Sequence, residues 1–155
     1  MPLVRLLGAA AVYSLLLLAA GWLLGPVRVL LIEPRLGPVM AVWAEAPLMA
    51  IAIILAARWT VARFLAGQGG APRLTLGLLA LTWVILAEIL GGILFRGRSA
   101  LETLSGWLTP AGWPLIGLYI LLLLAPWLFG RSPNGAGGPG PDSGSGPAHF
   151  PRETR

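Results

Sequence analysis

The chain alternates between long apolar runs and short segments that carry arginine. A helix that crosses a bilayer needs about 20 predominantly apolar residues. Four runs reach that length, at about residues 4–26, 37–58, 74–95 and 109–129. The pattern predicts an all-α fold, an integral membrane four-helix bundle formed by residues 1–129. Residues 130–155 are rich in Gly, Pro and Ser, cannot bury apolar surface and are predicted to form a disordered tail.

Composition supports this class of protein and excludes several kinds of chemistry. Only 11% of the 155 residues are charged, against about 25% in soluble domains. The 11 basic residues are all arginine, which excludes a lysine Schiff base and a Walker-type phosphate loop. There is no cysteine, and the single histidine, His149, lies in the polar tail. We therefore expect no cofactor and no metal site in the membrane. The arginines are scattered rather than clustered with aromatic residues, so we expect no nucleic-acid partner.

The segment between the third and fourth runs contains signals of local structure. Ser99 and Glu102 have the spacing of a capping box, in which each side chain satisfies a backbone N–H of the other residue. A short interfacial helix is predicted to follow, with one apolar face, made of Leu101, Leu104, Trp107 and Leu108. Thr109 and Pro110 are expected to be the N-cap and first residue of the fourth helix.

The arginines predict an orientation. One side of the bundle would hold Arg5, Arg58, Arg63, Arg73, Arg131, Arg152 and Arg155; the other would hold Arg28, Arg35, Arg96 and Arg98. The seven-to-four excess predicts that both termini are cytoplasmic, because cytoplasmic loops carry more positive charge. Five tryptophans near the run ends, Trp22, Trp59, Trp107, Trp113 and Trp127, are typical of an aromatic belt. Trp83 lies in the middle of a run and is expected to fill a helix interface.

Glu45 and Glu88 are the candidate functional residues, because an ionisable group inside an apolar run is costly and usually faces the protein interior. Each would lie about 10 Å inside the membrane from the same side, since a helix rises 1.5 Å per residue. Arg28 and Arg35 lie at that side and are candidate partners. Pro47 is expected to kink the second helix beside Glu45. Small residues at helical spacing, including Gly91 and Gly92 near Glu88 and Gly21 and Gly25 in the first run, would allow close helix packing.

Three interpretations of the glutamates stay open. They pair with arginine or hydroxyl groups and lock the helices together; or they line a cavity that binds or passes a proton, a cation or an amphipathic solute; or they act as general acid and base of an intramembrane enzyme. No nucleophile, metal ligand set or phosphate-binding loop accompanies them, so we expect a protein that is not an enzyme. One or both could also face a second copy of the chain or another membrane subunit, as in an accessory or assembly subunit of a larger complex.

Several short motifs carry a resemblance to a family. They are Arg28-Val-Leu, Pro34-Arg35-Leu-Gly37, Glu45-Ala-Pro47-Leu-Met49, Ala57-Arg58-Trp59 and Ala87-Glu88. With them, roughly residues 21–112 resemble small uncharacterised bacterial four-span inner-membrane proteins. The resemblance implies a four-span protein of the bacterial inner membrane and groups Arg28, Arg35, Glu45, Pro47, Arg58 and Glu88 as a candidate set. It implies no activity.

Overall fold

The computed structural model describes residues 2–97 and 99–129 and, for Phe95 and Arg96, the backbone alone. All regular structure in these residues is helical, so the all-α prediction is confirmed. The elements are α1 (Leu3–Val27), the π-helical segment η1 (Arg28–Ile32), α2 (Glu33–Phe64), α3 (Gly70–Arg96), α4 (Ala100–Gly106) and α5 (Trp113–Leu128). The predicted tail at residues 130–155, with His149, lies outside the described residues.

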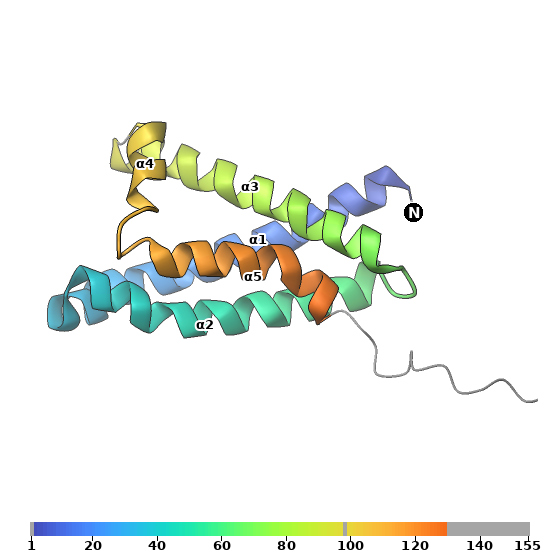
Figure 1. The fold of residues 1–155 in the computed structure, drawn as a ribbon, viewed down its shortest axis with the longest axis horizontal. Helices are drawn as coiled ribbons and strands as arrows, with labels where there is room; N and C mark the ends of the chain where they lie inside the picture. The colour runs from blue at the N-terminus through green and yellow to red at the C-terminus, as the bar shows by residue number, and fades with distance from the viewer. Residues whose placement is uncertain (1, 98, 130–155) are drawn as a thin grey trace, which may run out of the picture.

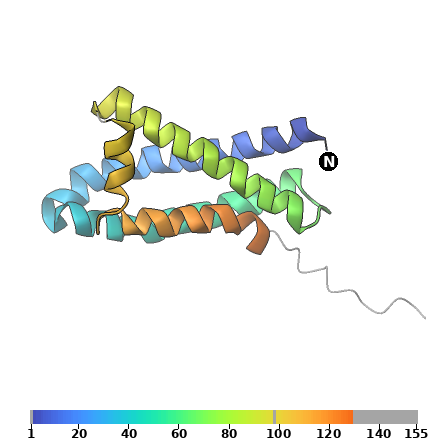
Figure 2. The same cartoon turned by 45° about the horizontal axis from the view of Figure 1, so that its top comes forward.

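α1 and α2 form an antiparallel hairpin, and the chain reverses at Gly37 (Figures 1 and 2). Helical structure continues through η1 and the first turn of α2, until Gly37 adopts φ 77° and ψ 164°. That conformation is open almost only to glycine, because a Cβ atom would clash with the backbone. Pro38 follows directly, where its fixed φ suits the first turn of a helix.

The four long helices form a ring in which α2 and α3 occupy opposite corners. α1 packs against α2 and α3, and α5 packs against the same two helices. In Figure 1, α3 lies above, α2 below, α5 in front and α1 behind. The N-terminus, the turn between α2 and α3, and the end of α5 lie at one end of the bundle; the hairpin reversal and α4 lie at the other.

The hydrophobic core occupies the half of the bundle nearest the N-terminus. Its buried residues are Ala9, Ala10, Tyr13, Leu17, Ile53, Ala57, Val61, Leu65, Leu76, Ala80, Val84, Leu122 and Ala125. Two polar side chains bond across it: the Tyr13 hydroxyl donates to the Leu122 carbonyl at 3.2 Å, and the Ser14 hydroxyl donates to the Ala10 carbonyl at 2.8 Å and reaches the Ala80 carbonyl at 3.4 Å. Toward the α4 end, α3 diverges from α2 and α5 (Figures 1 and 2).

The outward faces of the long helices are apolar. Large exposed side chains include Leu15 and Leu23 on α1, Leu48 and Leu55 on α2, Leu78 and Leu90 on α3, and Ile120 on α5. By length and composition, two helical stretches are able to cross a membrane: Leu3–Phe64, which contains the reversal, and Gly70–Leu94. Trp113–Leu128 is apolar but shorter. These properties alone are a weak sign of membrane insertion, because core helices of soluble proteins share them.

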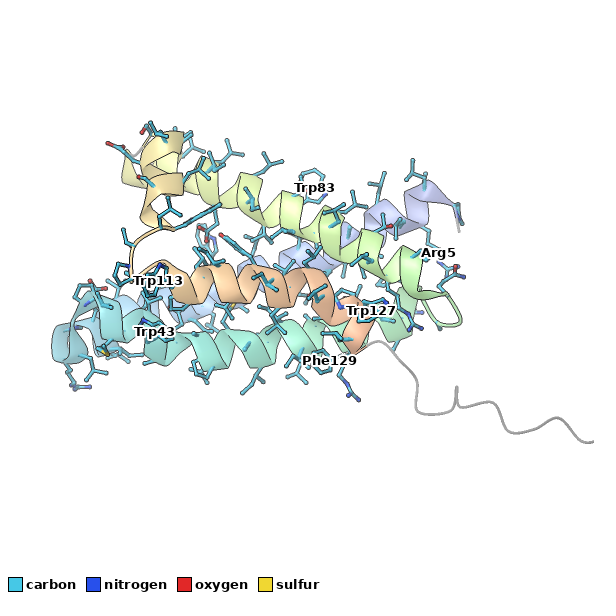
Figure 3. The ribbon with its side chains drawn as sticks, in the orientation of Figure 1. Arg5, Trp43, Trp83, Trp113, Trp127 and Phe129 are labelled. Atoms are coloured by element: carbon cyan, nitrogen blue, oxygen red, sulfur yellow. The ribbon has the colours of Figure 1, made fainter. Side chains whose placement is uncertain are left out.

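Trp83 corrects one prediction. Its side chain is 52% exposed and lies on the outer side of α3, so it does not fill a helix interface (Figure 3). The buried face of α3 is set by Leu76, Gly77, Ala80 and Val84. Trp83 is one residue before Val84, which turns it about 100° away around the helix.

The capping box predicted at α4 is confirmed, but the residues predicted to share one apolar face point in different directions. The Ser99 hydroxyl accepts the Glu102 N–H at 3.2 Å, and the Glu102 carboxylate accepts the Ser99 N–H at 2.7 Å. Leu101 and Leu108 are 76% and 77% exposed, whereas Trp107 is turned inward. The helix ends at Gly106, so Trp107 does not continue the register of the leucines.

The predicted start of the fourth helix at Thr109 is wrong. The Thr109 hydroxyl donates to the Gly106 carbonyl at 2.7 Å and closes a turn instead of capping a helix. Gly112 is the N-cap residue, and Pro114 takes the tolerated position in the first turn of α5. Gly112 lies directly against the backbone of Gly106 and Trp107, where a Cβ would not fit, and this contact holds α4 to the start of α5.

Candidate functional site

Arg28 and Glu45 form an ion pair that joins the two arms of the α1/α2 hairpin. Arg28 Nε lies 3.1 Å from Glu45 Oε2, and the two side chains are 25% and 18% exposed. The Nε atom itself is buried, and its N–H direction does not meet hydrogen-bond geometry. Because each charge neutralises the other in a poorly solvated position, loss of either partner would leave an uncompensated charge. The pair was one of the partnerships expected for Glu45.

Arg35 and Pro47 are placed differently. The Arg35 guanidinium donates to the Leu31 carbonyl of the preceding turn at 3.5 Å and is exposed, so Arg35 is directed along its own helix, whereas Glu45 pairs with Arg28. Pro47 is exposed and lies within helical backbone of α2, where the non-helical dihedral angles belong to Gly37. The kink expected at Pro47 stays a prediction.

Glu88 lies beside the hydroxyl of Tyr119, which projects from α5. The two groups interact electrostatically, but the hydroxyl is buried and does not close a hydrogen bond of normal geometry among the described residues. The indole of Trp107 meets the Tyr119 ring edge to face, with ring centres 5.2 Å apart and planes at 71°. Trp107 thus links the segment after α4 to Tyr119, and Tyr119 links α5 to α3.

Sequence reasoning did not single out Tyr119. A signal was present, because the chain has only two tyrosines and both lie inside apolar runs. A phenol in such a run needs a polar partner when it is buried. Tyr13 finds the Leu122 carbonyl, and Tyr119 faces Glu88.

The two glutamates lie at similar distances from the same end of the bundle. Glu45 is 8 residues after Gly37, and Glu88 is 9 residues before Gly97, which ends α3. At 1.5 Å per residue these separations are about 12–14 Å. Their helices occupy opposite corners of the ring, and each carboxylate has its own neighbour, Arg28 for Glu45 and Tyr119 for Glu88. These four side chains (Arg28, Glu45, Glu88 and Tyr119), which form two pairs near the same end of the bundle, are called the polar cluster.

Close helix packing occurs at only one of the four glycines expected to allow it. A Cβ on Gly21, Gly25 or Gly91 would have no heavy atom within 4 Å. A Cβ on Gly92 would lie 2.7 Å from Thr103 Oγ1, so Gly92 does allow α4 to approach α3. Among the described glycines of the long helices, Gly77 makes the closest approach to another helix, because it lies against the backbone of Leu123.

Comparison of the chain with protein-family models, curated proteins and solved structures found no match. The functional argument therefore rests on the fold and on the geometry of the polar cluster.

Proposed function

We propose that the chain is a non-enzymatic, four-span protein of the bacterial inner membrane, with the polar cluster inside its outer half. The observation that carries the proposal is the apolar outward face shared by α1, α2, α3 and α5, on helices that bury only a small core. Water would make such a surface costly, whereas lipid chains would cover it without cost. The four-span family resemblance is consistent with this assignment.

The lengths of the helices support a transmembrane arrangement. α1 and α3, of 25 and 27 residues, would be about 37–41 Å long, enough for a hydrocarbon core of about 30 Å. α5 has 16 residues and would reach only about 24 Å. The turns at residues 107–112 and α4 fill the remaining depth, and they place the exposed Leu101 and Leu108 at the lipid interface.

The distribution of arginine supports cytoplasmic termini. Arg5, Arg58, Arg63 and Arg73 belong to the end that contains the N-terminus and the end of α5. Positive charge is retained on the cytoplasmic side during insertion. The polar cluster and α4 then lie toward the outer face.

Alkaline carbonate extraction tests the membrane assignment. Membranes from cells that express the full chain are washed at high pH, which removes peripheral proteins and leaves integral ones. We expect the protein to stay in the pellet and to enter solution only with detergent. Release into the carbonate supernatant, together with a peripheral control protein, would overturn the assignment.

The two halves of the polar cluster suit different tasks. The neutralised Arg28–Glu45 pair fits a structural lock on the hairpin. The Glu88–Tyr119 pair favours a second candidate function, a small transporter or channel subunit for protons, cations or an amphipathic solute, because it places an ionisable carboxylate beside a buried hydroxyl within apolar helices.

Flux measurements in liposomes test this second function. Proton or cation flux is compared between the natural chain, Glu88→Gln and the matched control Glu33→Gln. Glu33 lies at the same end of the bundle, in the first turn of α2. A transporter predicts that only Glu88→Gln abolishes flux. Equal flux in all three proteins would contradict transport through this site.

A further inference from the structure

We propose that four arginines at the N-terminal end of the bundle form a surface that binds anionic phospholipids of the cytoplasmic leaflet, such as phosphatidylglycerol. This arginine surface consists of Arg5 on α1, Arg58 and Arg63 on α2, and Arg73 at the start of α3. It rests on the membrane assignment above and lies at the opposite end of the bundle from α4 and the hairpin reversal (Figure 1).

Positive charge at this end is not balanced by carboxylates of the described residues. The four described carboxylates lie in the other half of the bundle, on Glu33, Glu45, Glu88 and Glu102. Within the part of the chain that the structure describes, none of the four arginines forms an ion pair. Residues 130–155 contain three arginines and two carboxylates, so their net charge is also positive. The counter-charge is therefore expected from outside the chain.

Arg5 and Arg73 occupy positions that are unfavourable unless an anion is nearby. Arg5 lies in the first turn of α1, and Arg73 is the fourth residue of α3. Neither first turn contains an acidic residue, and neither N-cap residue, Pro2 or Gly69, forms a side-chain cap. A helix N-terminus already carries partial positive charge and free N–H groups, so it repels a cation and attracts an anion. Arginines that only set the topology do not need these positions.

The two first turns lie at similar depth, because α1 and α3 run in the same direction (Figures 1 and 2). The Ser14 hydroxyl, 3.4 Å from the Ala80 carbonyl oxygen, marks a level at which the two helices touch. Arg5 lies nine residues before Ser14, and Arg73 lies seven residues before Ala80. At 1.5 Å per residue these separations are about 13.5 and 10.5 Å. Their difference of about 3 Å is less than the thickness of one headgroup layer, about 5–7 Å.

Aromatic side chains mark this end as a membrane interface. Trp59, beside Arg58, is 52% exposed, and its ring meets that of Phe64 edge to face with centres 6.1 Å apart. Trp127 near the end of α5 packs against Gly70, where a Cβ would lie 3.0 Å from the indole Nε1. Tryptophan is enriched at the level of lipid headgroups, because its ring is apolar and its N–H is polar. The arginines are thus expected at headgroup level.

Partial burial of Arg73 adds to the case for an anion. Its Nε atom is buried and has no hydrogen-bond partner among the described residues. Part of this guanidinium has lost its hydration without gaining a partner, which is costly for a charged group. The phosphate of phosphatidylglycerol would compensate the charge, whereas choline already compensates the phosphate of phosphatidylcholine. The arginine surface should therefore distinguish anionic from zwitterionic lipids.

Electron spin resonance of spin-labelled lipids tests the proposal. The full chain is reconstituted in phosphatidylcholine vesicles that contain a trace of phosphatidylglycerol or phosphatidylcholine with a nitroxide near the end of one acyl chain. Lipids in contact with the protein are motionally restricted, and the restricted fraction gives the relative association constant of each headgroup. We expect at least a twofold preference for phosphatidylglycerol at low salt, because each arginine near the membrane surface attracts anionic lipid. The preference should shrink at high salt, which screens exposed charges.

Two variants and a matched control locate the surface. The double variant Arg5→Gln/Arg73→Gln should lose at least half of the preference for phosphatidylglycerol, and Arg5→Gln alone should lose a smaller part. Arg5 is exposed at the start of α1, so its replacement keeps the test valid if the double variant misfolds. Arg35→Gln removes the same charge from an exposed position at the opposite end and should keep the natural preference. Circular dichroism verifies that each variant is folded.

The outcomes separate the arginine surface from the membrane assignment. Equal association of the two headgroups with the natural chain would overturn the surface. An unchanged preference in the folded variants, or an equal loss in Arg5→Gln and Arg35→Gln, would also overturn it. Restricted phosphatidylcholine would in each case still support an integral membrane protein. Absence of any restricted lipid would contradict the membrane assignment and the surface with it.

Discussion

The contact between Gly77 of α3 and Leu123 of α5 makes a sharp prediction about stability. A Cβ on Gly77 would collide with the Leu123 carbonyl oxygen and lie 2.9 Å from the carbonyl carbon and 3.2 Å from Cα. These are backbone atoms, so no side-chain rotation relieves the collision, and the two helices must separate. Gly21 of α1 is the matched control, because its Cβ position is open.

Two opposing effects set the expected changes in the free energy of unfolding. Overpacking of a close contact costs about 1–3 kcal/mol. Replacement of a helical glycine by alanine gains up to about 1 kcal/mol in helix propensity. Gly21→Ala should therefore keep or raise the free energy of unfolding. Gly77→Ala should be less stable than Gly21→Ala by about 1–3 kcal/mol, the packing cost that the control does not incur.

Unfolding in mixed dodecyl maltoside and sodium dodecyl sulfate micelles measures this difference. Loss of helical circular dichroism is followed against the fraction of dodecyl sulfate for the natural chain and both variants. Equal transition midpoints for Gly77→Ala and Gly21→Ala would show that α3 and α5 do not approach at Gly77. The described packing would then be refuted.

Three further changes are expected to alter the same unfolding midpoint. Arg28→Gln should lower the free energy of unfolding by roughly 1–3 kcal/mol, because it leaves the Glu45 carboxylate unpaired in a poorly solvated position. The double variant Arg28→Gln/Glu45→Gln should recover part of that loss. Purely additive effects of the two substitutions would argue against the ion pair. Gly37→Ala should cost about 1–3 kcal/mol because only glycine suits that backbone conformation, and an unchanged midpoint would exclude the described reversal. Thr60→Val should stabilise by about 1 kcal/mol, since the buried Thr60 hydroxyl has no hydrogen-bond partner among the described residues; a clear loss of stability would mean that the hydroxyl is satisfied.

Local patterns predicted local structure. The helical segments followed from apolar runs, and the capping box at Ser99 and Glu102 followed from two residue types at a fixed spacing. The start of α5 was misplaced because Thr109 and Pro110 also suit a turn, and the backbone contact of Gly112 with Gly106 and Trp107 that accompanies the turn leaves no signal in the residue types.

Partnerships between helices were predicted only as sets of candidates. Arg28 and Arg35 were equivalent by composition and position, and the structure separates them, because only Arg28 is directed toward Glu45. Gly21 and Gly77 likewise look alike in the sequence, yet only Gly77 meets another helix. Such choices depend on how each helix is rotated about its axis, and weak amphipathicity in uniformly apolar helices leaves that rotation undetermined.

Site-specific labelling of single cysteines tests the central claim most directly, since the natural chain contains no cysteine. Gln68→Cys lies in the turn between α2 and α3, and Ser105→Cys lies on α4 at the opposite end of the bundle. In intact bacterial cells, a membrane-impermeant maleimide should label Cys at position 105 and should label position 68 only after permeabilisation. Labelling of both positions from the same side of the membrane would contradict a bundle that spans it with the polar cluster toward the outer face.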